Sequence, residues 1–127
     1  MTWDFDRNRP IYLQISEKIC RRIVRGDLPP GARAPSVREL AAQLRVNPNT
    51  VQRAYQELER DGVLSARRGQ GSFVSEDPAV VTRLRREIAT AAARRYWAEV
   101  EALGLSPEEA RCLIDGTADG EKEDGAR

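Results

Sequence analysis

The chain contains no histidine, and its only cysteines are Cys20 and Cys112, which lie far apart in the sequence. Without an imidazole, the sequence has neither the usual general base nor a common metal ligand, and two distant cysteines do not form a zinc-binding spacing. Glycine-rich phosphate-binding motifs are missing as well. We therefore predict no enzymatic activity, no cofactor and no metal site, and we interpret both cysteines as small core residues.

No run of apolar residues approaches the roughly 18 that indicate a membrane-spanning helix. The first ten residues, MTWDFDRNRP, include acidic residues and lack the hydrophobic segment of a secretory signal. We therefore expect a cytoplasmic protein with no membrane partner. The length of 127 residues and the hydrophobic content of 40% indicate one domain with a small appendage.

The formal net charge is only +1, so the overall charge does not predict a nucleic-acid partner. The distribution is slightly more informative. Residues 1–78 carry 13 Lys and Arg against 10 Asp and Glu, a net of +3, whereas residues 79–127 carry 8 against 10, a net of −2. This split fits a binding domain followed by a nearly neutral appendage.

Two short amphipathic helices are predicted within residues 36–60, SVRELAAQLRVNPNTVQRAYQELER. Ser36 and Glu39 form a capping-box pattern, and Asn47 followed by Pro48 is typical of a second helix start. Only three residues separate the helices, so their apolar stripes must pack together in a helix-turn-helix with 48–60 as the recognition helix. The two stripes are Val37, Leu40, Ala41 and Leu44, then Val51, Ala54, Tyr55 and Leu58.

The outer face of the predicted recognition helix carries amides, a hydroxyl and a guanidinium, which can pair with base edges and phosphates. We expect Asn49, Gln52 and Arg53 to reach base edges, and Thr50 and Ser36 to hold phosphates together with the backbone at the two helix starts. The alternative is an ordinary helical hairpin with a solvated outer face.

A β-hairpin is predicted after this helix, with strands at residues 63–66 and 72–74. Its tip is basic and rich in glycine, and we expect DNA contacts from Arg67, Arg68, Gly69 and Gln70. A hairpin in this position is the wing of a winged helix. The alternative is that the arginines only keep a strand edge soluble. A further helix is predicted before the helix-turn-helix, from Pro10 to near Gly26.

The second half predicts two more helices, at residues 79–103 and from Pro107 onward. They are too small to enclose a small-molecule pocket of several hundred Å³, so we interpret them as a dimerisation hairpin. For Trp97, the alternative to a place in the dimer interface is a place in a small residual pocket. Residues 116–127 lack apolar side chains and are expected to be disordered. The predicted dimerisation residues are Leu84, Ile88, Ala92, Trp97, Val100 and Leu103.

The segment from Leu28 to Val74, LPPGARAPSVRELAAQLRVNPNTVQRAYQELERDGVLSARRGQGSFV, closely resembles the DNA-binding domain of the GntR family of bacterial transcription regulators. The preceding RPIYLQISEKICRRIVRGDLPPG resembles the first helix and loop of that domain. The form NPNTVQRAYQELE and the short C-terminal extension resemble the YtrA subfamily, whose reduced C-terminal region also implies dimerisation. The resemblance further implies a DNA contact for Arg38.

The chain departs from the family pattern at four positions, the first of which is Ala34, where family members usually have leucine. Pro48 and Gln52 stand where many GntR branches have arginine, so the base preference of those branches cannot be transferred. Arg45 stands between the two helices where the resemblance predicts glycine. If Arg45 is left-handed, this costs about 1 kcal/mol relative to glycine.

These observations predict a mainly α fold with a small β-hairpin. Residues 1–77 form a winged helix-turn-helix with an N-terminal arm, residues 78–115 a helical dimerisation segment, and residues 116–127 a disordered tail. The predicted function is a sequence-specific transcriptional repressor that binds an inverted-repeat operator in double-stranded DNA as a homodimer. The alternative is a protein-docking winged helix without DNA binding, but docking faces favour aromatic and Met residues. A small-molecule effector is left open.

Overall fold

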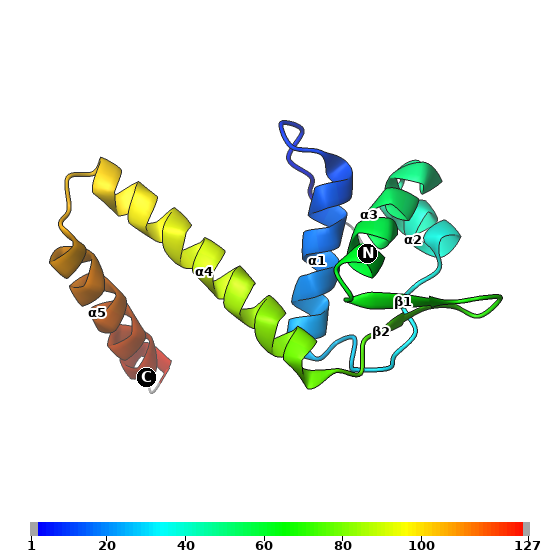
Figure 1. The fold of residues 1–127 in the computed structure, drawn as a ribbon. Coiled ribbons are helices and arrows are strands. Elements are labelled where there is room, and N and C mark those ends of the chain that lie inside the picture. The colour runs from blue at the N-terminus through cyan, green and yellow to red at the C-terminus, as the bar shows by residue number, and fades with distance from the viewer. Residues whose placement is uncertain (1–2, 126–127) are drawn as a thin grey trace. The chain divides into compact units, whose positions relative to one another are not determined.

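The computed structural model describes residues 3–125, and side chains from residue 3 to residue 118. The fold is mainly α with a small antiparallel hairpin, as predicted (Figure 1). The chain divides into two compact units, Met1–Arg86 and Glu87–Arg127, with the division inside α4. The elements are α1 (Ile11–Arg25), α2 (Val37–Leu44), α3 (Pro48–Arg60), β1 (Leu64–Arg67), β2 (Gly71–Val74), α4 (Pro78–Ala102) and α5 (Pro107–Gly125).

The predicted capping residues begin both helices of the helix-turn-helix. Ser36 Oγ accepts a hydrogen bond from the Glu39 N–H at 3.1 Å, and Asn47 Oδ1 accepts one from the Asn49 N–H at 2.8 Å. Each bond satisfies a backbone donor that has no partner within its own helix. Between the helices, Arg45 has φ 56° and ψ 47°, so the left-handed corner is confirmed.

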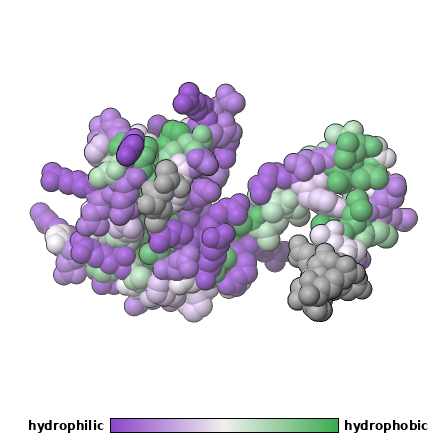
Figure 2. Space-filling model, turned by 180° about the vertical axis from the view of Figure 1, so that it is seen from behind, coloured by the Kyte–Doolittle hydropathy of each residue, from purple (hydrophilic) through white to green (hydrophobic). Residues whose placement is uncertain are grey.

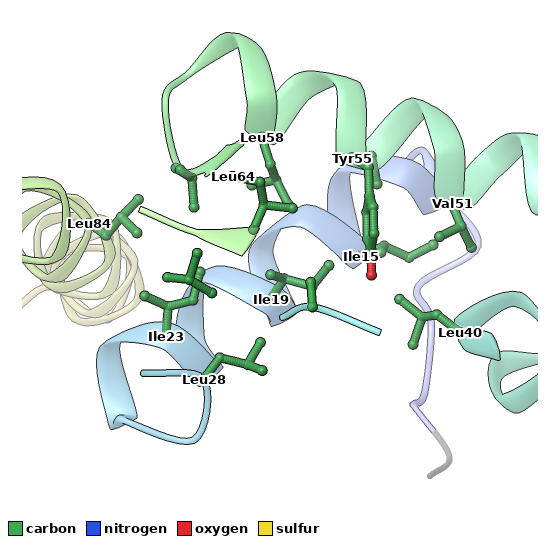
Figure 3. Packing of buried hydrophobic residues seen from close by; sticks show 14 of the residues in the cluster. Ile15, Ile19, Ile23, Leu28, Leu40, Val51, Tyr55, Leu58, Leu64 and Leu84 are labelled. Carbon is green, nitrogen blue, oxygen red and sulfur yellow. The ribbon is translucent and has the colours of Figure 1, made fainter. Parts of the chain in front are cut away.

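The core of the first unit lies where α1, α2 and α3 meet, and Figure 3 shows its side chains. The inner stripe of α3 is fully covered: Val51 and Ala54 are 0% exposed, and Tyr55 and Leu58 are 2% exposed. It packs against the apolar stripe of α1 and the buried side chains of α2, which explains why the short α2 is held in place. The contributing residues are Ile15, Ile19 and Ile23 of α1 and Leu40 and Ala41 of α2.

The wing is a hairpin with a third segment along one edge. β1 and β2 pair antiparallel with Leu64 opposite Val74 and Arg67 opposite Gly71. The loop before α2 then pairs with β2, because the Ala34 N–H donates to the Ser72 carbonyl at 2.9 Å and the Val74 N–H donates to the Ala32 carbonyl at 2.8 Å. These bonds connect the base of the wing to the start of the helix-turn-helix.

The first unit extends further along the chain than the expected boundary at residue 77. Leu84 is 5% exposed and belongs to the core cluster, and Val80 and Val81 pack against it. Arg83 Nη2 also donates to the Asp61 carbonyl, at the end of α3, at 2.8 Å. The first turns of α4 are therefore part of the winged-helix unit, and Leu84 is not available to a partner subunit.

The second unit is a helical hairpin made by the later part of α4 and by α5. Ser106 and Glu109 form a complete capping box, with N–H to side-chain bonds of 3.1 and 3.2 Å in the two directions. Tyr96 Oη donates to the Ala110 carbonyl at 2.6 Å and joins the two helices. Among the side chains of the hairpin that the structure describes, up to residue 118, those of Val100 and Ala110 are buried.

Helix α5 continues to Gly125, whereas we expected a disordered tail from residue 116. The residues in this stretch include Ala118, Glu121 and Lys122, which are residue types of high helix propensity. The prediction of disorder from the low apolar content of this stretch was therefore wrong, since its backbone is helical. Residues 126 and 127 lie outside the described residues. No helix in the described range is long and apolar enough to span a membrane.

Tyr55 connects the recognition helix to the loop that precedes α2. Its hydroxyl donates to the Pro35 carbonyl at 2.5 Å, and burial raises the pKa of the Tyr55 phenol from 10.0 to about 12, with a smaller contribution from the Glu39 carboxylate. The folded state thus favours the neutral phenol. Its contribution to stability is complete below pH 10 and is lost as the pH rises from 10 through 12.

We predict that Arg45→Gly raises the free energy of unfolding by about 1 kcal/mol, because glycine adopts the left-handed corner without steric cost. Urea unfolding monitored by circular dichroism measures the change. The matched control is Gln43→Gly inside α2, which should lower stability by about 0.5–1 kcal/mol. A destabilising Arg45→Gly would contradict the assignment of strain to this corner.

We predict that Tyr55→Phe lowers stability by about 1 kcal/mol at pH 8, because the carbonyl of the half-buried Pro35 loses its donor. Between pH 10 and 12 the wild type should lose on the order of 2 kcal/mol of stability relative to this variant. The phenol of Tyr55 ionises in the unfolded chain in this range, and folding must then return its proton, whereas the variant has no phenol. Unfolding free energies of the two proteins across this range provide the measurement. Parallel curves for the two proteins would show that Tyr55 does not titrate as described.

Candidate nucleic-acid interface

The outer face of α3 follows directly from the burial of its inner face. With Val51, Ala54, Tyr55 and Leu58 turned into the core, the intervening positions must face outward. Asn49, Gln52, Arg53 and Gln56 are all exposed, and Thr50 is half-buried beside them. The exposed face of the predicted recognition helix is therefore made of amides and one guanidinium.

Arg53 is exposed, yet it is held against a side chain from outside the helix-turn-helix. Its guanidinium carbon lies 3.9 Å from the centroid of the Tyr12 ring, and its Nη2 donates to the Tyr12 hydroxyl at 3.3 Å. Tyr12 belongs to the first turn of α1 and packs against the core. A stacked and hydrogen-bonded arginine has fewer rotamers to lose on binding than a free one.

A hollow of about 400 Å³ lies between the starts of α1 and α3. Its walls bring together three of the predicted DNA-binding residues, Asn49, Thr50 and Arg53, while Gln52 is exposed on the same helix without lining the hollow. The remaining lining residues are Ile11, Tyr12 and Asn47. The hollow therefore presents amide, hydroxyl and guanidinium groups beside the N-terminus of α3, which carries a positive partial charge.

The start of α2 places two further predicted residues. Arg38 is exposed in the first turn, where its side chain can reach a phosphate or a base. Ser36 is half-buried and its Oγ is occupied as the N-cap acceptor for Glu39. The Ser36 hydroxyl hydrogen is a donor, so a phosphate contact and the capping bond are compatible.

The wing exposes its basic tip. Arg68, Gly69 and Gln70 are exposed in the turn between the strands, and Gly69 has φ 75°, a conformation that disfavours side chains. Arg67 stacks on the Phe73 ring with its guanidinium carbon 4.1 Å from the centroid. Arg67 and Arg53 are therefore both supported by an aromatic ring.

Two participants in this surface were not predicted. The sequence-based predictions give Tyr12 no functional role, and its contact with Arg53 spans 41 positions in the sequence. Arg33 lies against the wing, since a Cβ added to Gly71 would be 3.1 Å from Arg33 Nε. No local pattern signals either contact, because both depend on how distant segments pack.

The predicted dimerisation residues divide into buried and accessible groups. Leu84 and Val100 are buried within the chain itself, whereas Ile88 and Trp97 are half-buried and Ala92 and Leu103 are exposed. Leu113 and Ile114 of α5 are also about half exposed. Hydrophobic residues gather on the second unit in the face that Figure 2 shows.

Ala92 and Trp97 also line a mostly apolar groove of about 620 Å³ along the hairpin. Its other walls include Tyr96, Ala110 and Ile114, with Arg111 and Asp115 also among the lining residues. We expected no enclosed pocket of this size, and this feature is an open groove on the surface of two helices. In the described range, no group of acidic or cysteine side chains could hold a metal ion.

Comparison with known proteins gives one family. Residues 11–74 match the family described as bacterial regulatory proteins, gntR family. The chain is 45% identical over 105 residues to the uncharacterised regulator YhcF of Bacillus subtilis, covering 83% of this chain and 87% of YhcF. It is 47% identical over 68 residues to the transcriptional repressor YtrA of the same organism, covering 54% of this chain and 52% of YtrA.

Solved structures agree with this result. A GntR family transcriptional regulator from Listeria monocytogenes matches with a TM-score of 0.81 and 38% identity, covering 88% of this chain and 98% of that one. The DNA-binding domain of AraR, solved in complex with its operator ORX1, matches with a TM-score of 0.54 and 28% identity over 59% of this chain and 95% of that one. The winged helix, its polar recognition face and these matches lead to one conclusion: the chain belongs to the GntR family of bacterial regulatory proteins.

Proposed function

We propose that this GntR-family regulator is a repressor that binds an inverted-repeat operator as a homodimer, in the manner of YtrA-type regulators. The observation that carries the proposal is the exposed face of α3, where Asn49, Gln52 and Arg53 offer base-reading groups over a fully buried inner stripe. The AraR domain with the same fold has been solved on an operator. Such a role is binding rather than catalysis, and it is exercised in the cytoplasm, where bacterial DNA lies.

Positive side chains from several elements support DNA binding. Arg38, Arg53, Arg67 and Arg68 are all exposed, although they lie in a chain whose net charge is only +1. Contacts from arginines to phosphates would fix the register, and the α3 side chains would discriminate bases. The alternative function, a protein-docking module, is less well supported, because docking surfaces are enriched in aromatic side chains and depleted in charge.

Homodimerisation would place two recognition helices on successive faces of the duplex, which explains the preference for an inverted repeat. The second unit supports this role. Leu103, Leu113 and Ile114 are exposed there, whereas the winged-helix unit exposes only Leu13 among the large hydrophobic side chains of the described range. We propose that a second copy of the chain covers the hairpin and its groove, as exposed apolar surface of this kind favours.

We predict that Arg38→Ala weakens operator binding about tenfold or more, because a charge-assisted contact in the first turn of α2 is lost. A gel-shift titration with a DNA fragment from the promoter of its own gene measures this. Arg94→Ala, an exposed arginine of the second unit, is the matched control and should bind normally. The log–log salt slope should also fall by about 0.9 if Arg38 contacts a phosphate. Unchanged affinity with Arg38→Ala would remove this residue from the interface.

We predict that the double substitution Leu113→Gln and Ile114→Gln converts the dimer into a monomer, because both side chains are exposed and their change should not unfold the hairpin. Sedimentation equilibrium gives the mass, and circular dichroism confirms the helix content. Leu13→Gln, which changes an exposed hydrophobic residue of the first unit, should leave the dimer intact. A wild-type chain that sediments as a monomer at micromolar concentration would exclude the proposed assembly.

A further inference from the structure

We infer that Tyr12 is a positioning residue for DNA recognition: from α1, outside the helix-turn-helix, it holds the Arg53 guanidinium in the orientation that reads a base pair. This inference rests on the proposed DNA-binding function. It adds a role in sequence specificity for a residue that is not part of the recognition helix. Its basis is the stack of the Arg53 guanidinium on the Tyr12 ring, 3.9 Å from guanidinium carbon to ring centroid.

The platform under Arg53 is itself fixed relative to α3. Tyr12 is half-buried and packs against the core cluster. Ser16, one turn later in α1, shares its hydroxyl hydrogen between the Tyr12 carbonyl at 3.1 Å and the Ala54 carbonyl at 3.3 Å. Because Ala54 follows Arg53 directly, this bridge ties the backbone at the ring to the backbone at the arginine. Together with the packing of the ring against the core, this bridge restrains where the ring lies relative to Arg53.

Stacking fixes the plane of a guanidinium and leaves its edges open. Of the five N–H groups of Arg53, one on Nη2 faces the Tyr12 hydroxyl at 3.3 Å, so at least four are available. Reading a guanine requires two donors in one plane, directed to O6 and N7. Tyr12 thus restrains the arginine without using the donors that such a contact needs. A side chain held in this way loses less entropy on binding.

The neighbours of Arg53 favour base reading over a phosphate contact. Asn49 lies one helical turn before Arg53 on the same face, is exposed, and lines the same hollow. An amide and a guanidinium side by side form a continuous base-reading edge along α3, because each can pair bidentately with a purine. A phosphate contact by Arg53 is the competing outcome, and it differs by lacking sequence dependence.

The test starts from a randomised pool of duplexes, from which the wild-type full-length chain selects its preferred sequence. Fluorescence anisotropy then measures affinity for that duplex and for each of its single base-pair substitutions. Five variants are compared with the wild type: Tyr12→Phe, Tyr12→Leu, Arg53→Ala, Arg53→Lys and the double variant Tyr12→Leu/Arg53→Ala. Thermal unfolding of each variant reports whether the fold is retained.

Arg53→Ala should lose about tenfold in affinity for the preferred duplex and lose its preference at one position of each half-site. Tyr12→Leu should lose preference at that same position, and the Tyr12→Leu/Arg53→Ala double variant should be no worse than Arg53→Ala alone. Tyr12→Phe keeps the ring and should keep most of the preference. Arg53→Lys keeps the positive charge but lacks the planar guanidinium with its paired donors. It should therefore lose the base preference at this position while the slope of log affinity against log salt concentration stays unchanged.

Two results would overturn the inference. One is a Tyr12→Leu variant that folds and retains full preference at the position lost by Arg53→Ala. The other is a uniform loss of affinity across all duplexes, with a shallower salt slope for Arg53→Ala, which would assign Arg53 to a phosphate. A wild-type chain that enriches no sequence would instead overturn the proposed function, and this inference with it.

Discussion

The burial of one stripe of α3 against α1 is the constraint on which the first unit depends. Val51, Ala54, Tyr55 and Leu58 are covered by the isoleucines of α1, and no buried side-chain polar atom in the described range lacks a partner. A helix that turns these four positions inward has no freedom left in the orientation of its other side. The polar face of α3 is thus a geometric consequence of core packing, and no separate interaction is needed to expose it.

One polar contact in the middle of α3 and another at its C-terminal end then restrain its position along its axis. Tyr55 bonds to the Pro35 carbonyl ahead of α2, and Arg83 from the first turns of α4 bonds to the Asp61 carbonyl at the end of α3. Hydrogen bonds are directional where apolar packing is not, so they restrain sliding that the stripe alone would permit. The recognition helix is therefore connected to the element before it and to the element after the wing. This arrangement suits a surface whose side chains must meet fixed base edges.

The second unit follows a different physical principle. Its two helices bury little beyond Val100 and Ala110, and they expose Leu103, Leu113 and Ile114. A helical hairpin of this size cannot cover its own apolar surface, because there is no third element to complete a core. We propose that a second copy of the chain complements this surface, which would leave assembly and DNA reading to separate units.

The sequence by itself determined the elements of the first unit and their order. The two apolar stripes and the caps at Ser36 and Asn47 are local patterns, so they could be read without a structure, and they lie where predicted. The hairpin was also predicted, but its first strand is shifted by one residue to Leu64–Arg67 and its second begins one residue earlier, at Gly71. Tertiary structure alone decided which side chains meet. The stack of Arg53 on Tyr12, the bond from Arg83 to Asp61 and the burial of Leu84 in the winged-helix core join residues that no periodicity connects. The reason is physical: secondary structure reflects neighbours a few positions apart, whereas these contacts arise only when separate helices pack around a common core.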